Sequence, residues 1–581
     1  MENNEKLAHI RHTLAHLLAQ AVLEHYPNSK LTLGPAVDNG FYYDIDFNDE
    51  KLSNDDLSKL EKTMQKNLSA WTEFTHREAS KEEALKEFSG NQYKEELINE
   101  IVDRGETITL YTCGGFTDLC RGGHAENPAK EIAKGSWKLE RVAGAYWRGD
   151  EKNKMLTRIY GLAFESNEKL KEYKFQIEEA KKRDHRKIGK EMGLFVFSDL
   201  VGAGLPLWTP RGTIIRELLN DYVWELRKSY GYQKVCIPHI TKKELYETSG
   251  HWAKYADDLF KINTREDHLY AMKPMNCPHH TQIFDAEPRS YRDMPQRYAE
   301  TTMVYRDEQS GELSGLSRVL SITQDDAHVF CRENQIENEA LAVWDIVEKF
   351  YGTFGFNLQV RFSRHDPQTP EKYLGGSEVW TKAENALENL MKGKGVQWID
   401  GIGEAAFYGP KIDFISKDSI GRVLQVATIQ LDFNQPKNFG LTCTNEKGEK
   451  EQVVMIHAAI MGSIERFMST LIEHLAGEFP VWLSPTQVAI IPVLEEKHNE
   501  YANTIYASLK TQEIRTEIFD KKDSLGKRIH VAKAGKTPYI IVIGDKEIES
   551  GILTIETRTE KIQMTLPEFL TKISNQIKNR N

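Results

Sequence analysis

The sequence predicts a multidomain α+β protein, and three observations support this fold class. With 581 residues the chain exceeds the length at which a single hydrophobic core keeps growing, so three or four domains are expected. Residues 481–581 alternate strand and helix patterns, which is typical of an α/β sandwich. Before residue 163, short helical and strand segments are mixed, with turn signals at Asp38-Asn39-Gly40 and Gly114-Gly115.

A charged segment separates the first part of the chain from the largest one. Residues 164–190 lack proline and carry a sparse apolar stripe, which predicts one long linker helix ending in the basic run 181–187. That run is either a solvated helix end or a contact to a nucleic-acid backbone. Pro480 and Pro485 mark a second junction. The predicted domains are residues 1–163, a linker at 164–190, a large domain at 191–480 and a C-terminal domain at 481–581.

Strand patterns occur in the large domain at residues 235–237, 268–272 and 423–433. A regular strand over the last segment would place Gln425 and Gln430 on opposite faces, so both reach one ligand only through a bulge or a long twisted strand. In the C-terminal domain the patterns predict strands at 487–493, 514–519, 539–544 and 552–557, and helices at 499–509, 525–534 and 566–578.

The composition is that of a globular protein, with 40% hydrophobic and 28% charged residues. The net charge of -11 argues mildly against a nucleic-acid partner, although a large acidic enzyme can carry a local basic face. The sequence has neither a signal peptide nor an apolar run of 18 residues, so we expect a cytoplasmic protein with no membrane partner. Six cysteines do not make a disulfide framework, which fits a reducing cytosol.

Two groups of residues have the chemistry of metal ligands. Cys277, His328 and His457 offer one thiolate and two imidazoles, and three ligands leave a zinc ion an open position. Near the N-terminus, His12 and His16 lie one helical turn apart, and the run 118–124 adds two more candidates, Cys120 and His124. Spacing alone favours a closed tetrahedral zinc site there. A zinc protease is excluded because Thr13 stands where that motif needs glutamate.

Three stretches resemble the signature motifs of class II aminoacyl-tRNA synthetases. Residues 231–238 after a long helix resemble motif 1, residues 305–308 with 315–318 resemble motif 2, and residues 462–467 resemble motif 3. With the three metal candidates interleaved, the chain resembles threonyl-tRNA synthetases of the bacterial type from about residue 9 to about residue 575. The small N-terminal ubiquitin-like domain common in bacterial members is expected to be absent, because Met1 stands only 11 residues before His12.

The resemblance implies a class II antiparallel-sheet catalytic core, an N-terminal α+β editing domain and a C-terminal α/β anticodon-binding domain. It implies a threonine–tRNA ligase that uses ATP with Mg²⁺ and holds one Zn²⁺ per subunit on Cys277, His328 and His457. The implied partners are L-threonine, ATP, tRNA(Thr) and a second copy of the chain, which binds through motif 1.

The resemblance also assigns roles in the catalytic core. Arg306 is expected to hold the α-phosphate of ATP and Arg466 the γ-phosphate, since arginine makes bidentate charge-assisted bonds to phosphate. Glu308 is expected to face adenine, Asp326 to accept the hydroxyl proton of threonine, and His251 to assist transfer to the tRNA ribose. The further residues expected at this site are Gln324, Tyr408, Lys411, Gln425 and Gln430, which line the amino acid and adenylate, and Arg318 of motif 2.

In the N-terminal domain the resemblance favours a hydrolytic pocket for seryl-tRNA, generally without metal, over the closed zinc site. Such a pocket answers a physical need, because one missing methyl gives only about 1–3 kcal/mol of discrimination between serine and threonine. Glu547 is the expected anticodon contact; Glu556 and Lys522 depart from the usual residues at further contact positions. The expected pocket residues are His12, His16, Cys120, His124, Lys94, Asp118 and Tyr43.

Two other function classes compete with the ligase: a non-catalytic binder of tRNA-like RNA, and a freestanding editing hydrolase with a decayed ligase core. Motif 2 is unusual at Asp307 and Gln309, His279 replaces a common glycine, and Ala427 replaces another. None of the candidate zinc ligands or clamp arginines is replaced, and this favours the ligase.

Overall fold

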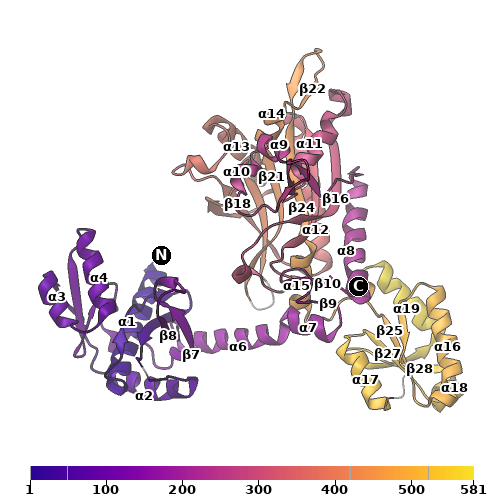
Figure 1. The fold of residues 1–581 in the computed structure, drawn as a ribbon. Helices are drawn as coiled ribbons and strands as arrows, with labels where there is room; N and C mark the ends of the chain where they lie inside the picture. The colour runs from indigo at the N-terminus through magenta and orange to yellow at the C-terminus, as the bar shows by residue number, and fades with distance from the viewer. Residues whose placement is uncertain (1, 49, 418–420, 521–522) are drawn as a thin grey trace. The chain divides into compact units, whose positions relative to one another are not determined.

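The computed structural model describes residues 2–48, 50–417, 421–520 and 523–581, and divides the chain into two compact units, residues 1–178 and 179–581 (Figure 1). The departure at Lys522 lies outside the described residues. Among the described residues, the helices are too short or too polar for any of them to cross a lipid bilayer.

Helix α1 (Glu2–His25) is the centre of the first unit. It contains neither glycine nor proline and ends two residues before Pro27, which cannot continue a helix. Its residues 14–22 are almost entirely buried, and they pack in one cluster with strand β3 and helix α2. The position of α1 at the centre of the unit fixes His12 and His16 next to the sheets.

Two antiparallel sheets complete the first unit, in the orders β1-β3-β8-β7 and β4-β5-β6. Both turns predicted from the sequence are confirmed as hairpin turns: Val37 pairs with Gly40, and Cys113 pairs with Phe116. Gly114 and Gly115 both have positive φ, as a two-residue hairpin turn of type I′ requires. The elements are α2 (Leu57–Leu68), α3 (Lys81–Glu87), α4 (Gln92–Asp103), α5 (Pro128–Glu131), β1 (Lys30–Leu31), β2 (Ala36–Val37), β3 (Gly40–Asp46), β4 (Thr75–Ala79), β5 (Ile108–Cys113), β6 (Phe116–Leu119), β7 (Trp137–Tyr146) and β8 (Met155–Ala163).

The single linker helix expected at 164–190 is wrong in one respect, because the structure contains two helices. Helix α6 (Asn167–Arg183) ends before Asp184, and helix α7 (His185–Glu191) begins after it. The Asp184 side chain accepts a hydrogen bond from the backbone N–H of Arg186, so the aspartate acts as the N-cap of the second helix. The basic run is therefore divided between a helix end and a helix start.

An eight-stranded sheet forms the core of the second unit, in the order β11-β16-β17-β24-β21-β20-β18-β19. It is antiparallel except at the two edge pairs. Helices α8, α12 and α15 bury their apolar faces in one cluster with it. The predicted strand at 268–272 is confirmed as β14, whereas the one at 235–237 is displaced to β11 (Gln233–Lys234).

The predicted strand at 423–433 is confirmed as β21 (Val423–Asp432), and it contains a bulge. Phe414 of β20 pairs with Ala427, but the next residue Ile415 pairs with Gln425, so Val426 is the additional residue. The additional residue shifts the alternation of side chains, and Gln425 comes to lie on the same face as Gln430. This is the arrangement that both glutamines need to reach one ligand.

The helices of residues 185–480 are α7, α8 (Pro210–Ser229), α9 (Lys243–Thr248), α10 (His251–Lys254), α11 (Cys277–Asp285), α12 (Ile336–Thr353), α13 (Ser377–Lys394), α14 (Asn434–Asn438) and α15 (Ile464–Leu475). The strands of the same segment are β9 (Phe195–Val196), β10 (Leu207–Trp208), β11, β12 (Ile240–Lys242), β13 (Lys261–Asn263), β14 (Leu269–Met272), β15 (Arg289–Ser290), β16 (Gln296–Tyr305), β17 (Ser321–Cys331), β18 (Leu358–Arg364), β19 (Trp398–Ile402), β20 (Lys411–Lys417), β21, β22 (Thr442–Thr444), β23 (Lys450–Gln452) and β24 (Val454–Ser463).

The C-terminal part is the α/β sandwich that the sequence predicts. Its sheet has the order β26-β25-β27-β28-β29, with α16 and α19 on one face and α17 on the other (Figure 1). Helix α18 and strand β29 were not predicted. The elements are β25 (Val488–Pro492), α16 (Glu495–Thr511), β26 (Thr516–Ile518), α17 (Leu525–Ala534), β27 (Tyr539–Ile543), α18 (Asp545–Ser550), β28 (Ile552–Glu556), β29 (Lys561–Thr565) and α19 (Leu566–Lys578).

Candidate functional site

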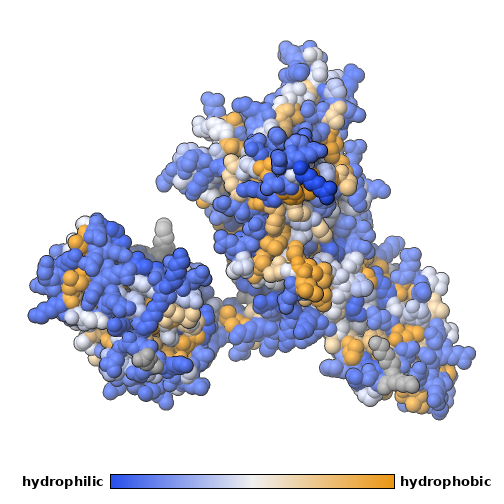
Figure 2. Space-filling model, viewed as in Figure 1, coloured by the Kyte–Doolittle hydropathy of each residue, from blue (hydrophilic) through white to orange (hydrophobic). Residues whose placement is uncertain are grey.

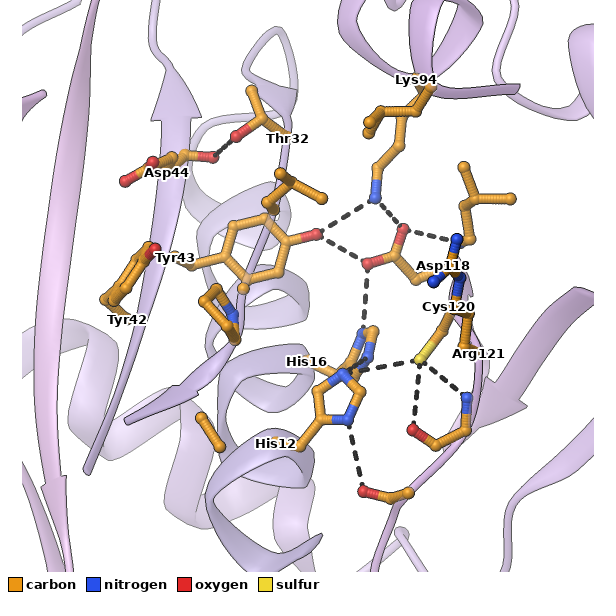
Figure 3. Close-up of a pocket in the computed structure, with 18 of the residues that line it drawn as sticks. His12, His16, Thr32, Tyr42, Tyr43, Asp44, Lys94, Asp118, Cys120 and Arg121 are labelled. Atoms are coloured by element: carbon orange, nitrogen blue, oxygen red, sulfur yellow. Dashed lines mark hydrogen bonds and ion pairs between the residues drawn. The ribbon is translucent and has the colours of Figure 1, made fainter. Parts of the chain in front are cut away.

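The first candidate site lies beside helix α1 in the first unit (Figure 3). The Nε2 atoms of His12 and His16 are 3.1 Å apart. The Sγ of Cys120 lies 3.5 Å from Nε2 of His12 and 3.4 Å from Nε2 of His124. The structure therefore brings the four ligand-type residues of the N-terminal domain into one cluster.

The buried carboxylate of Asp118 joins this cluster to the two other predicted pocket residues, Tyr43 and Lys94 (Figure 3). Asp118 Oδ2 lies 3.1 Å from Nδ1 of His16 and accepts a 2.6 Å hydrogen bond from the hydroxyl of Tyr43. Lys94 forms an ion pair with the same carboxylate. Lys94 and Asp118 are at most 2% exposed. Burying a single charge is costly, and the opposite charge of each partner offsets this cost for the other.

The cluster contains two oppositely charged groups. Burial alone would raise the pKa of Cys120, but hydrogen bonds from His12, His124 and His16 lower it to about 3. Burial alone would lower the pKa of His16, but Asp118 and Cys120 raise it to about 9. A thiolate therefore lies beside an imidazolium at neutral pH. Groups of this kind can hold and move protons in a hydrolytic reaction.

The cluster opens into a cavity of about 790 Å³, which Arg121, Arg148 and Arg158 also line. A cavity of this size accommodates a small organic group, and arginines suit an anionic one. Four nitrogen and sulfur ligands with a carboxylate behind His16 also meet the donor requirements of a structural zinc site. The cavity favours the hydrolytic interpretation, because a closed metal site does not need an open cavity beside it.

The second candidate site is a cavity of about 1020 Å³ in the second unit. Motif 2, motif 3 and strand β21 all contribute to it. Arg306 lies over the ring of Tyr255, with 5.4 Å between the guanidinium carbon and the ring centre. Arg318 Nε donates a 2.8 Å hydrogen bond to Oε2 of Glu308. The predicted residues that line this cavity are Arg306, Glu308, Arg318, Gln324, Tyr408, Lys411, Gln425, Gln430 and Arg466.

One carboxylate that the sequence reasoning missed holds part of this cavity wall. Asp413 on β20 is fully buried, and its Oδ1 accepts a 2.8 Å hydrogen bond from Nε2 of Gln425. Its Oδ2 lies 3.3 Å from Nζ of Lys411. The signal that could have found it is the Lys411-Ile412-Asp413 alternation, which puts the charged pair on one face of a strand.

The third candidate site brings Cys277, His328 and His457 together, with their ligand atoms within 4.8 Å of one another. His328 and His457 pair across neighbouring strands β17 and β24, and Cys277 is the first residue of α11. His328 Nε2 and His457 Nδ1 are 3.1 Å apart, close to the roughly 3.4 Å between two nitrogen ligands of tetrahedral zinc. The donor set and its spacing fit zinc.

Each of the two histidines has a partner at its other ring nitrogen, which leaves one nitrogen directed to the site. His280 Nδ1 lies 2.8 Å from Nδ1 of His328, and Asp432 Oδ2 lies 3.1 Å from Nε2 of His457. Burial holds the pKa of His328 well below its usual value, so this ring is neutral, as a metal ligand must be. The sequence alone predicts no role for His280 or Asp432, although such partners commonly orient ligating histidines.

Asp326 and His251 also lie beside the three-ligand site. Asp326 Oδ1 is 3.8 Å from Nε2 of His328, and Oδ2 accepts a 3.0 Å hydrogen bond from Asn276. Burial raises the pKa of Asp326 to about 6. His251 is fully buried, with Nε2 3.6 Å from Sγ of Cys277. The structure therefore places His251 against a candidate ligand, outside the set of residues that lines the 1020 Å³ cavity.

Glu547, the expected anticodon contact, lies at the start of helix α18. Its Oε2 accepts a 3.0 Å hydrogen bond from the backbone N–H of Gly544, and its Oε1 accepts a 2.7 Å bond from Thr554. Glu556 forms an ion pair with Lys533. The structure thus gives Glu547 a local partner at each carboxylate oxygen.

Comparison with known proteins gives matches along most of the chain. Residues 260–475 match the family "tRNA synthetase class II core domain (G, H, P, S and T)". Residues 487–576 match "Anticodon binding domain", and residues 108–160 match "Threonyl and Alanyl tRNA synthetase second additional domain".

Two curated relatives and one solved structure show the same similarity. The threonine–tRNA ligase of Flavobacterium johnsoniae is 47% identical over 574 residues, which is 98% of this chain and 88% of the relative. The Porphyromonas gingivalis threonine–tRNA ligase is 47% identical over 579 residues, 96% of this chain and 88% of the relative. The RNA binding domain of threonyl-tRNA synthetase from Cryptosporidium parvum aligns with a TM-score of 0.64 at 33% identity, over 68% of this chain and 98% of that structure.

Proposed function

The chain belongs to the threonine–tRNA ligase family, and we propose that it activates L-threonine with ATP in the 1020 Å³ cavity of its second unit. The family's reaction joins threonine to tRNA(Thr) at the expense of ATP, giving threonyl-tRNA, AMP and pyrophosphate. The observation that carries the placement is that both clamp arginines line this cavity, together with Lys411 and the two glutamines of β21. Threonine-dependent exchange of pyrophosphate into ATP tests it directly.

The arginines supply the phosphate-binding chemistry. In our proposal Arg306 binds the α-phosphate that the threonine carboxylate attacks, and Arg466, in the first turn of α15, binds the γ-phosphate. Both are cations that bond phosphate oxygens in pairs, and charge on those oxygens increases during the attack. Mg²⁺ would accompany ATP as the family implies, and Glu308 would contact adenine.

We expect Arg306→Ala and Arg466→Ala each to slow pyrophosphate exchange by roughly a hundredfold or more, the loss typical when one charge-stabilising donor is removed. Exchange is measured at saturating threonine, so that only the ATP-dependent step is affected. Arg292→Ala is the control, because Arg292 is exposed and stands outside the residues lining the cavity. Exchange at the wild-type rate in either clamp variant would disprove the assigned role.

We further propose that Cys277, His328 and His457 hold one zinc ion per subunit. When bound, zinc would offer open positions to the amino and hydroxyl groups of threonine, and valine has no hydroxyl to fill them. The chain's own contribution is to orient the two imidazoles through His280 and Asp432 and to exclude water. In our proposal Asp326 accepts the threonine hydroxyl proton, and the position of its carboxylate beside His328 supports this role.

The first unit carries the editing domain, and we propose that it hydrolyses seryl-tRNA(Thr) at the cluster around Cys120. Serine differs from threonine by one methyl, so a site that recognises amino and hydroxyl groups rejects it weakly. Support comes from the thiolate, the imidazolium and the Lys94–Asp118 ion pair, which all line a 790 Å³ cavity. We propose further that the enzyme is cytoplasmic. All six of its cysteines are free, as is usual for proteins of a reducing compartment.

We also propose a homodimer, formed through motif 1. Support comes from an apolar surface on the β9–β10 hairpin, which leads directly into α8, the helix before motif 1. Val196, Phe197, Leu200, Val201 and Leu207 are all more than 40% exposed, and Figure 2 shows the orange surface that they contribute to. Exposed apolar surface of this kind is typical of protein interfaces.

Sedimentation should give a species of twice the 66.7 kDa of one chain at micromolar concentration. We expect Phe197→Asp to shift the protein toward the monomer, because a charge would have to be buried in the interface. Leu494→Asp is the matched control, since Leu494 is a similarly exposed apolar residue of the C-terminal domain. A wild-type protein that sediments only as a monomer would refute the dimer.

A further inference from the structure

A buried histidine at the start of α7 contacts both ATP-binding motifs. His185 Nδ1 lies 2.7 Å from Oε1 of Glu473, a residue of the motif 3 helix α15. On the other side of the ring, Nε2 accepts a 3.0 Å hydrogen bond from the backbone N–H of Leu316, in the turn of motif 2. His185 is 4% exposed, and Leu316 is fully buried.

The hydrogen bonds define the state of the ring. Because the backbone N–H of Leu316 can only donate, Nε2 must be the unprotonated nitrogen, and the proton is on Nδ1, where it is donated to Glu473. Burial opposes the charge of Glu473, but His185 and Arg422 outweigh burial and lower the pKa of this carboxylate. The ring is therefore a neutral bridge between a carboxylate and a main-chain N–H.

The turn fits closely around this ring. Gly315 has φ +50, and a Cβ at this position would overlap the His185 ring and the Arg186 side chain. The turn is also hydrogen-bonded to helix α15, because the hydroxyls of Ser317 and Ser469 are 3.0 Å apart. The turn is thus held to α15 through the bridge at Leu316 and the hydroxyl pair at Ser317.

The turn carries a residue of the ATP site only two positions further on. Arg318 forms an ion pair with Glu308, and both side chains line the 1020 Å³ cavity. Glu473 and its ion-pair partner Arg422 line the same cavity. A change in the position of Leu316 is therefore transmitted to Arg318 along the chain and to Glu308 through the ion pair.

We propose that His185 is a positioning residue for ATP, which holds the motif 2 turn at a fixed place relative to the motif 3 helix. The acceptor Nε2 is the atom that performs this function, because it satisfies a buried main-chain N–H that has to stay beside α15. The inference rests on the proposed ATP site. It goes beyond that site because it assigns a role to a residue that does not line the cavity.

Replacing His185 by asparagine or by glutamine tests the two hydrogen bonds of its ring separately. An asparagine places its amide near the position of Nδ1 and can bond Glu473, but it does not reach Leu316. A glutamine can place its carbonyl oxygen near the position of Nε2 and accept from Leu316. The positioning role thus predicts that His185→Gln restores ATP binding and that His185→Asn does not.

The test is pyrophosphate exchange measured against ATP and against threonine separately, with full-length protein. In His185→Ala, His185→Asn and Gly315→Ala we expect the KM for ATP to rise about tenfold, the effect of leaving a buried donor unpaired. The KM for threonine and the zinc content should stay unchanged. His185→Gln should stay within about threefold of wild type.

His498→Ala is the matched control. His498 is also buried, with one ring nitrogen accepting from the backbone N–H of Leu494 at 3.0 Å and the other 3.0 Å from Asp545, but it lies in the C-terminal domain. Equal effects of the Asn and Gln variants, an unchanged KM for ATP in His185→Asn, or a parallel rise in both KM values would each overturn the proposal. Absence of exchange in the wild type would instead disprove the proposed function.

Discussion

Replacing Cys277 by alanine should abolish threonine activation and release the bound metal. Cys277 supplies the only sulfur of the three-ligand set. In its absence, two imidazoles alone would have to hold the zinc ion. Losing an outer partner of a metal ligand commonly costs 10–100-fold in affinity or activity, so loss of a ligand should cost more than about a hundredfold. The measurements are zinc per subunit by elemental analysis and threonine-dependent exchange.

Cys443→Ala is the control for loss of a buried thiol. Cys443 is 1% exposed and packs in the same apolar cluster as Cys277, yet it stands outside the candidate ligand group. It should keep stoichiometric zinc and near-normal exchange. If the wild type were fully active after its metal had been removed, the zinc role proposed for Cys277, His328 and His457 would be wrong.

The double substitution His12→Ala with His16→Ala should eliminate hydrolysis of seryl-tRNA(Thr) while threonine charging continues. The His12 ring contacts the Cys120 thiolate, and the His16 ring contacts both His12 and Asp118. Loss of the two rings therefore removes groups that can position water and move protons. The ligase cavity belongs to the other compact unit. The expected sign is accumulation of seryl-tRNA(Thr) when serine is supplied.

His25→Ala serves as the control on the same helix, since His25 bonds Thr63 and does not line the editing cavity. The structural-zinc interpretation makes a different prediction for the double variant. If the zinc is structural, the double variant would lose a stoichiometric metal or unfold, and the wild type would show no deacylation of seryl-tRNA(Thr). That combination of results would contradict an editing role for this cluster.

Local signals explain where the sequence predicted the fold well. Helices α17 and α19 begin and end at the predicted residues, because Ser524 caps the first and Pro567 lies in the first turn of the second. The break at Asp184 was missed, because a single capping aspartate inside a long charged segment looks like an ordinary helical residue. Its effect depends on contacts of α7 with α15, which are distant in sequence.

The candidate sites show the same division. Ligand-type residues were found because His, Cys and Arg in recognisable motifs stand out in the sequence, and the structure brings them together. Their supporting partners were not found. Asp413 lies beside Gln425 because β20 pairs with β21, and Asp432 lies beside His457 because β21 pairs with β24. His280 lies beside His328 because helix α11 packs against β17. A sequence motif contains no information on such long-range pairing.

The bulge in β21 also affects how the length of this strand can change in evolution. Val426 is the residue without its own partner on β20, and removing it would pair Gln425 with Ile415 as before, in a regular ladder. Both glutamines would then still face the same cavity. An insertion between Gln425 and Gln430 that left the bulge in place would turn one of them to the opposite face. Val426 therefore marks the position where this lineage could shorten the strand by one residue without exchanging the side chains that line the 1020 Å³ cavity.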